Sequence, residues 1–260
     1  MTQTSDIHSR RGSWAMRIVL LGFVVALAAA LLLVAAPLGY RAGLWSLRAA
    51  LLDLPRLYVF YGGIAGAAIS LLALVVTAAS RRGGWAALAA LGIAIGAGSA
   101  YVPWSFAERG RALPPINDIT TDTANPRAFE AVMPLRDAAH AQPVTYGPDL
   151  PALQKQAYPD IVPAHLDEPA DQAFAAALDT VRKKGWTIVA ADGERRRIEA
   201  TDTTFWYGFT DDIAVRVSAD GAGSRVDVRS KSRVGRGDFG TNARRVRDYL
   251  AAIKSTGGAS

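Results

Sequence analysis

The chain of 260 residues contains no cysteine. This absence excludes disulfide bonds, cysteine nucleophiles, iron–sulfur clusters and thiolate-ligated zinc. Histidine is nearly as scarce, because only His8, His140 and His165 occur, and their spacing matches no metal site. The sequence therefore predicts neither a metal ion nor another cofactor.

Acidic residues are scarce before residue 112. Residues 1–111 hold ten arginines against three acids, a net charge of +7, whereas residues 112–260 hold 19 basic and 20 acidic residues, a net charge of −1. A nucleic-acid-binding surface needs basic charge concentrated on a folded domain. Because the second part of the chain is nearly neutral, the sequence argues against nucleic acid as a partner.

Charge is absent from the inside of three long apolar runs, about residues 17–38, 57–79 and 86–102. A helix needs about 20 residues to cross about 30 Å of hydrocarbon, and buried helices of a soluble protein would carry charges in runs this long. Aromatic rings of the kind that favour membrane interfaces mark the ends of the runs: Trp14, Tyr40, Trp45, Tyr58, Tyr61, Trp85, Tyr101 and Trp104. The sequence predicts a membrane domain of three helices over residues 1–104, embedded in a lipid bilayer.

The first run has a second interpretation as a signal peptide. It is longer than the usual apolar region of about 7–15 residues in such peptides, and two further spans follow it. These features favour an uncleaved helix, with cleavage at Ala35–Ala36 as the alternative.

Arginines near the spans decide the predicted orientation. With the N-terminus inside, five lie on each side of the membrane, so the count alone is a tie. The dominance of the first helix and the tight loop holding Arg81 and Arg82 favour a cytoplasmic N-terminus. We therefore expect a multi-pass protein of the cytoplasmic (inner) membrane whose C-terminal domain is periplasmic.

Glycines recur at four-residue spacing in two spans, at Gly62 and Gly66 and again at Gly92 and Gly96. Small residues at this spacing let helices approach closely. They predict a seam within the chain or with a membrane-protein partner, the alternative being a composition that is simply rich in Gly and Ala. The absence of charge inside the spans argues against an ion path.

Proline changes the character of the chain after the spans. Residues 105–165 are rich in proline and in acids, which predicts an extended segment lying over a neighbouring domain. Residues 166–260 are the expected core of that domain. Its first helix is predicted to begin after Asp167 as N-cap and to end at Gly185.

Four strands and a last helix complete the predicted domain. Trp186–Ala191 and Arg195–Thr203 form one hairpin, with Ile188 facing Ile198 and Trp186 facing Ala200. The second hairpin joins Asp212–Ala219 to Arg225–Val234, and the last helix runs from about Asn242 to Lys254. The expected partners in the second hairpin are Val217 with Val226, Val215 with Val228, Arg216 with Asp227, and Asp212 with Lys231. The predicted fold is thus three transmembrane α-helices followed by an α+β domain with an antiparallel sheet covered by helices.

The C-terminal third resembles the family called domain of unknown function 1499 (DUF 1499). The resemblance covers about residues 115–254 and rests on four stretches: Tyr207–Asp212, Arg229–Gly235, Asp238–Asn242 and Arg244–Val246. Many relatives carry a Cys-Pro-x-x-Pro-Asn-Cys stretch where this chain has Asp118–Pro126, so any lipid anchor or disulfide made by those cysteines is missing. The resemblance implies a bacterial envelope or plastid setting and no established activity.

Polar residues gather around the end of the last predicted strand and the start of the last helix. Arginines and unpaired helix N–H groups together can bind an anion such as a phosphate, a lipid headgroup or a carboxylate. The alternative is that the acids neutralise the arginines and fix the loop. The candidate residues are Asp211, Asp212, Arg229, Ser230, Ser232, Arg233, Arg236, Asp238, Asn242 and Arg245.

Catalysis is the less favoured interpretation of the same residues. Adjacent strand residues point to opposite faces, so Asp211 and Asp212 do not form an acid–base pair. Ser230 or Ser232 would need a base, and no histidine is near in sequence. We expect a membrane-anchored binding or scaffold module of the cell envelope, the alternative being a small hydrolase or lipid-processing enzyme. A pocket that places His140 or His165 beside either serine would favour the enzyme.

Overall fold

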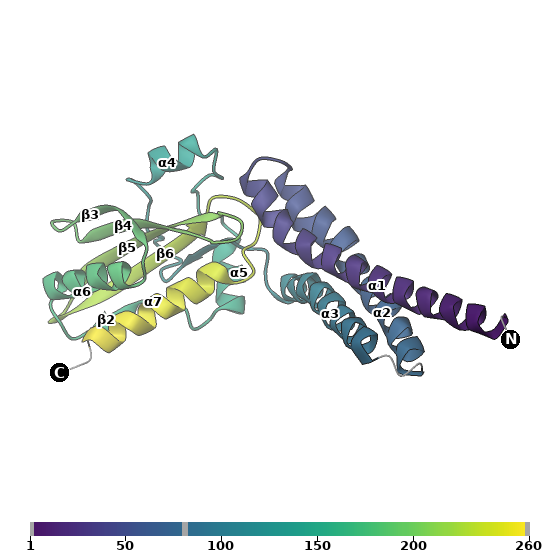
Figure 1. Ribbon diagram of the computed structural model, residues 1–260. Coiled ribbons are helices and arrows are strands. Elements are labelled where there is room, and N and C mark those ends of the chain that lie inside the picture. Colours follow the sequence, from purple (N-terminus) through teal and green to yellow (C-terminus); the bar gives the residue numbers. More distant parts are fainter. Residues whose placement is uncertain (1–2, 80–82, 258–260) are drawn as a thin grey trace. The chain divides into compact units, whose positions relative to one another are not determined.

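A computed structural model describes residues 3–79 and 83–257 of the chain (Figure 1). The chain divides into two compact units, Met1–Glu108 and Arg109–Ser260. Arg81 and Arg82, on which the predicted orientation depends, lie outside the described residues.

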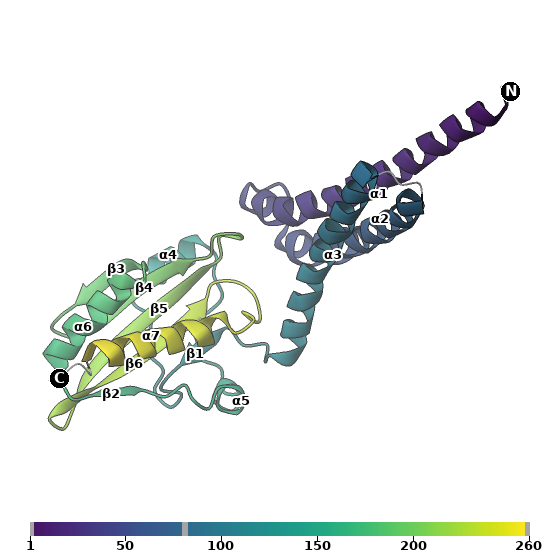
Figure 2. The ribbon, with the colours of Figure 1, turned by 60° about the horizontal axis from the view of Figure 1, so that its bottom comes forward.

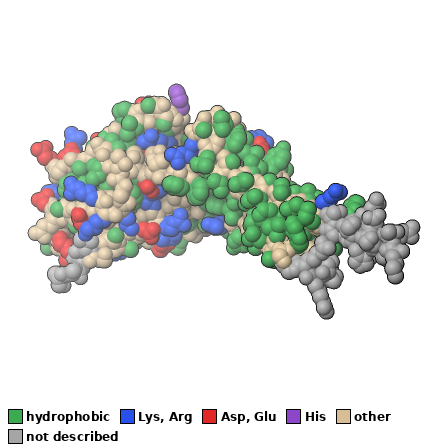
Figure 3. All heavy atoms as spheres, in the orientation of Figure 1, with side chains coloured by type: hydrophobic (Ala, Val, Ile, Leu, Met, Phe, Trp, Pro, Cys, Tyr) green, Lys and Arg blue, Asp and Glu red, His purple; other side chains and the backbone are tan. Residues whose placement is uncertain are grey.

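The first unit is helical. It contains α1 (Gln3–Arg41), a π-helical segment η1 (Ala49–Phe60) that continues into α2 (Tyr61–Ala79), and most of α3 (Gly83–Ala112). Three helical stretches among the described residues are long and apolar enough to cross a membrane: Trp14–Arg41, Ala49–Ala78 and Gly84–Ala112. This confirms the predicted helices, each of which extends beyond its apolar run. Hydrophobic side chains cover the visible face of this unit (Figure 3).

Glycine allows close packing inside the helical unit. A Cβ atom added to Gly66 would lie 2.6 Å from the backbone nitrogen of Ala26 in α1, and one added to Gly96 would lie 2.6 Å from the carbonyl oxygen of Gly63 in α2. Helix backbones therefore meet directly, as the small-residue spacing predicted. Gly62 differs from the other predicted glycines, because its added Cβ would meet only the Cβ of Ala29, at 3.5 Å.

The second unit is built on a six-stranded antiparallel sheet of order β1-β6-β5-β4-β3, with β2 also paired to β6. The strands are β1 (Asp118–Thr120), β2 (Ala164–Leu166), β3 (Thr187–Asp192), β4 (Arg197–Thr203), β5 (Thr210–Asp220) and β6 (Gly223–Ser232). The helices are α4 (Met133–Ala138), α5 (Leu150–Ala157), α6 (Ala170–Lys183) and α7 (Thr241–Gly257). Helices α6 and α7 cross the same face of the sheet (Figure 2), which confirms the predicted α+β class.

Alternation along the strands places the core between the sheet and these two helices. Val215 and Val217 of β5 face it beside Val226 and Val228 of β6, and all are buried. From α7, Tyr249 enters this core and donates a hydrogen bond to the carbonyl of Ala177 in α6 at 3.0 Å. Burying apolar area at about 25 cal/mol per Å² makes this the main stabilising layer of the domain.

The predicted register is confirmed in the second hairpin and is wrong in the first. The four residue pairs predicted between β5 and β6 are all present. In the first hairpin the predicted register is wrong, because Ile188 pairs with Ala200 and Ala191 pairs with Ile198, with a bulge between Ile188 and Ala190. The loop is also longer than expected, since β4 begins at Arg197 rather than Arg195, and Arg196 adopts a φ of 50°. A left-handed residue closes this loop, and the bulge shifts the pairing beyond it.

Asp167 is not the N-cap of α6. The helix begins at Ala170, because Pro169 has an extended conformation with ψ of 150° and stands in the N-cap position. Asp171 supplies the acidic residue in the first turn.

A covering segment, about residues 121–147 and including α4, lies on the other face of the sheet. Phe129 and Val132 pack on Ala214 of β5, and the backbone amides of Glu130 and Val132 donate to the carboxylate of Glu199 in β4 at 2.8 and 3.0 Å. At the sheet edge, the amide of Gln154 in α5 both donates to and accepts from the backbone of Thr120 in β1. The edge strand is thereby closed by a side chain.

Candidate functional site

The polar cluster predicted from the sequence is divided by the sheet. Side chains alternate along β6, so Ser230 and Ser232 face α7 whereas Arg229 lies on the opposite face. Likewise Asp211 faces α7 and Asp212 faces the segment before α6. The candidates therefore form two sites rather than one.

On the α7 side, Asn242 is the centre of a buried hydrogen-bond network. Its amide donates to the Ser232 hydroxyl at 2.9 Å, and its side-chain oxygen accepts from Ser230 at 2.5 Å. Arg245 donates to the same oxygen at 2.6 Å and forms ion pairs with Asp211 at 2.7 Å and Asp202 at 2.8 Å. Both predicted serines are thus engaged within the domain.

Asp238 fixes the turn that leads into α7. Its carboxylate accepts from the backbone amides of Gly240 at 2.9 Å and Asn242 at 2.7 Å, which satisfies donors at the start of the helix. Burial raises the pKa of Asp238 above its ordinary value, although these hydrogen bonds partly oppose the shift. Phe239 and Gly240 have φ of 54° and 76°, so the carboxylate supports a left-handed turn.

On the opposite face, Asp212 binds two arginines. It accepts from Arg136 of α4 at 2.5 Å and from Arg233 at 2.7 Å, and Arg233 also donates to the carbonyl of Leu135 at 3.3 Å. Lys231 faces Asp212 in register, as predicted, but its ion pair is with Asp118 at 3.1 Å. The expected Asp212–Lys231 charge pair is therefore wrong, because Arg136 and Arg233 bind Asp212 while Lys231 binds Asp118 of β1.

Arg229 is the most enclosed of the predicted arginines. It donates to both oxygens of Asp118 at 2.9 and 2.7 Å and to the carbonyls of Arg127 and Val144. Its guanidinium lies 4.9 Å from the ring centre of Phe129 and 5.6 Å from that of Tyr146, which adds cation–π attraction. The guanidinium of Arg229 is therefore already bound by a carboxylate and two carbonyls of the same domain.

A second ionic group on this face was not predicted as a site. Asp227 binds Arg216 and Arg225, and both arginines also reach Asp122. Burial alone would raise the pKa of Asp122, but the backbone amide of Asn125 and the two arginines outweigh it and lower that pKa. Strand register did reveal the Arg216–Asp227 pair, whereas Asp122 comes from the covering segment.

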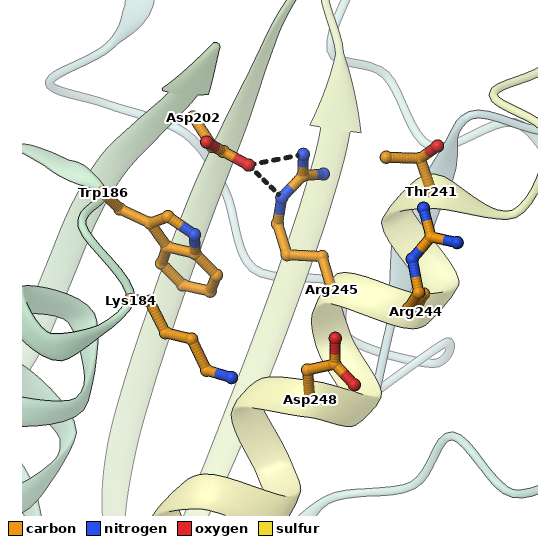
Figure 4. Close-up of a pocket in the computed structure, with 7 residues that line it drawn as sticks. All are labelled: Lys184, Trp186, Asp202, Thr241, Arg244, Arg245 and Asp248. Carbon is orange, nitrogen blue, oxygen red and sulfur yellow. Dashed lines mark hydrogen bonds and ion pairs between the residues drawn. The ribbon is translucent and has the colours of Figure 1, made fainter. Parts of the chain in front are cut away.

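The remaining cations of this region are exposed. Arg236 and Arg244 lie on the surface, and among the residues that the structure describes neither forms an ion pair. Arg244 borders a hollow of about 190 Å³ with Lys184, Trp186, Asp202, Thr241, Arg245 and Asp248. Figure 4 shows Arg245 turned to Asp202 beside this hollow. Within the described ranges no three acidic or histidine residues are grouped to hold a metal ion.

The histidines lie outside the polar cluster. His165 faces Arg225 on β6 and forms a 2.7 Å contact with Asp220 at the exposed end of the hairpin. His140 is exposed and has a φ of 48°. Arg225, the residue opposite His165, is five residues from Ser230 along β6, which is about 16 Å at the usual strand rise. His165 is therefore not beside Ser230.

These features define a protein with three helices suited to a membrane and an α+β domain whose sheet buries paired charges. The chain belongs to the family described as "Protein of unknown function (DUF1499)", whose model matches residues 118–253. That match confirms the resemblance noted in the sequence, and no protein among those curated for function matches the chain.

Among solved structures, two are similar to a part of the chain. The crystal structure of Ara h 8.0201 has 12% identity and a TM-score of 0.32, covering 38% of this chain and 95% of that chain. The crystal structure of CalU16 from Micromonospora echinospora has 15% identity and a TM-score of 0.27, covering 36% of this chain and 73% of that chain.

Proposed function

We propose that this protein is a non-catalytic binding or scaffold module of the cell envelope, anchored in the cytoplasmic membrane with its C-terminal domain outside the cytoplasm. The observation that carries the proposal is the filled, mutually paired polar cluster. Hydrogen bonds or ion pairs within the same domain engage the side chains of Ser230, Ser232, Asp211 and Asp212. An arrangement of this kind favours structure over chemistry.

The enzyme alternative needs a base beside Ser230, and among the described residues no general base is in hydrogen-bond contact with this serine. The Ser230 hydroxyl contacts Asn242 and Arg245, and neither can take its proton as a general base does. His165 lies about 16 Å along β6 from Ser230 and pairs with Asp220. No observation favours a hydrolase over a binding module.

An anionic ligand is the finer part of the proposal. Arg233, where the sequence suggested the site, is bound to Asp212 and to the carbonyl of Leu135, so its guanidinium is already engaged within the domain. Exposed Arg236 and Arg244, which flank the turn into α7, are better placed to receive a phosphate or carboxylate from solution. A protein partner through the glycine faces is less well supported, because Gly66 and Gly96 already pack within the chain.

Anion binding is tested with inorganic phosphate on the full chain in detergent micelles. We expect saturable binding by calorimetry that is lost in the double variant Arg236→Gln/Arg244→Gln and kept in Arg182→Gln, which removes an exposed cation from α6. Equal binding by the double variant and the parent chain would exclude this site. The scaffold proposal would not be affected by that result, because it is tested separately by capture of a protein partner from solubilised membranes.

The orientation is tested by single cysteines, since the natural chain has none. Cysteine replaces exposed Ala222 in the β5–β6 turn in one variant and Gly84, where an added Cβ meets nothing within 4 Å, in the other. A membrane-impermeant maleimide on intact cells with a permeable outer membrane should label Ala222→Cys and spare Gly84→Cys until lysis, because one span separates them. The reverse pattern would place the domain in the cytoplasm.

A further inference from the structure

Aromatic side chains are concentrated in the loop between β4 and β5. The sequence Thr204–Phe209 holds four aromatic residues in six positions. Phe205 is 78% exposed and Trp206 51% exposed, and Phe239 of the turn into α7 is 46% exposed. These are large apolar side chains on the surface of an otherwise charged domain, and such surfaces mark interaction sites.

The loop is held in a defined conformation. The Thr204 amide donates to the carbonyl of Phe209 at 2.8 Å, and the amide of Gly208 donates to the carbonyl of Thr204 at 3.0 Å. Phe205 and Trp206 meet edge to face at 5.3 Å between ring centres, and Tyr207 and Phe209 stack at 5.0 Å. The rings are therefore presented in a fixed arrangement, which lowers the entropic cost of docking.

The loop lies at the end of the sheet where the chain enters the domain. Thr203 and Thr210 are the last pair of β4 and β5, and Asp118, the first residue of β1, pairs with Lys231 near the end of β6. Only residues 113–117 separate β1 from α3. At no more than about 3.5 Å per residue, this connection keeps Asp118 within about 20 Å of Ala112, the last residue of α3.

We propose that the β4–β5 loop, with Phe239, is a docking surface for the bilayer that the chain itself enters. Trp, Tyr and Phe rings favour the headgroup region, where an apolar body and a polar edge are both accommodated. Exposed Arg236, three residues from Phe239 in the chain, adds attraction for anionic headgroups. The inference rests on the membrane anchoring proposed above, but not on the phosphate site.

In this proposal the β4–β5 loop and Phe239 hold the domain against the membrane surface. The opposite end of the sheet, at the β5–β6 turn, would then point away, because β5 has 11 residues and a length of about 35 Å. The loops at the two ends of β5 therefore provide a test position and a matched control.

The test uses the full chain in lipid nanodiscs with one environment-sensitive fluorophore. The fluorophore is attached to Phe205→Cys in one protein and to Ala222→Cys in the other. We expect the probe at position 205 to shift to shorter wavelength and to be quenched by phospholipids carrying a nitroxide near the headgroup. The probe at position 222 should keep its aqueous spectrum and remain unquenched.

Three outcomes are informative. Quenching at position 205 that also falls when Trp206 and Phe239 are replaced by serine supports aromatic docking. A blue shift without lipid quenching would overturn the proposal, since it means that the loop packs on protein, either the chain's own helices or a second copy. An aqueous spectrum at both positions would overturn it as well. Because this readout is contact of the probe with lipid and not binding of inorganic phosphate, loss of the anion site and loss of membrane docking are separable results.

Discussion

Asp212→Ala should lower the free energy of unfolding of the C-terminal domain by about 3–5 kcal/mol, because it leaves two buried or nearly buried arginines without their counter-charge. Arg136 is 2% exposed and Asp212 is fully buried. Asp212 also holds Arg233, which lies at the end of β6 and donates to the α4 carbonyl of Leu135. One carboxylate therefore joins the sheet to the segment that covers it.

The matched control is Asp220→Ala, which removes a carboxylate from the same strand, β5. Asp220 pairs with His165, and both are exposed, so its removal should cost no more than about 1 kcal/mol. Both variants are measured in the full chain in mild detergent, by urea unfolding followed by pulse proteolysis of the C-terminal domain. Equal losses in the two variants would show that the buried pair contributes nothing special.

Asp212 and the nearby Arg233 could be selected from the sequence as members of one polar cluster, but the second partner of Asp212, Arg136, could not. Strand periodicity correctly placed Asp212 opposite Lys231 and on the face away from Asp211. The guanidinium that binds it comes from Arg136, 76 residues earlier in the chain. No local pattern relates two such residues, because the contact between α4 and the sheet is a tertiary one.

The strand register could be predicted from the sequence only where the turn between the strands is regular. Asp220 and Gly223 close a two-residue turn whose flanking valines alternate cleanly, so register followed from the pattern. In the β3–β4 hairpin, Arg196 adopts a left-handed conformation that is uncommon for a residue with a side chain. A bulge after Ile188 then shifts the pairing by one residue, and nothing in the residue types signals it.

In the candidate site, too, residues close in sequence were predicted together, whereas a partner far away in sequence was missed. Ser230, Ser232, Asn242 and Arg245 were selected together from sequence, and the structure brings them into one network. Asn117 completes it by accepting from Asn242, although 125 residues separate the two. The exposed aromatic loop, by contrast, was only partly singled out from the sequence, because the family resemblance includes Tyr207 and Phe209 but not Phe205 and Trp206, whose exposure suggests the role.

Gly96→Leu should have the second large effect, on the helical unit. A Cβ at this position would lie 2.6 Å from the carbonyl oxygen of Gly63 and 2.8 Å from the amide nitrogen of Ala67. Both atoms belong to the backbone of α2, so a side-chain rearrangement cannot relieve the overlap and the helices must separate. Overpacking of this kind costs about 1–3 kcal/mol and occasionally more.

Gly98→Leu is the control that separates packing from helix propensity. Gly98 lies in the same helix and is exposed, and a Cβ added there meets nothing within 4 Å. Both substitutions replace glycine by a better helix former, worth about 1 kcal/mol in a helix interior. We therefore expect Gly98→Leu to keep or raise the apparent melting temperature in detergent, while Gly96→Leu lowers it and broadens the size-exclusion peak. If the two variants behave alike, contact between α2 and α3 does not depend on glycine, and α3 is held in the bundle by the side chains around Ala89 and Val19 instead.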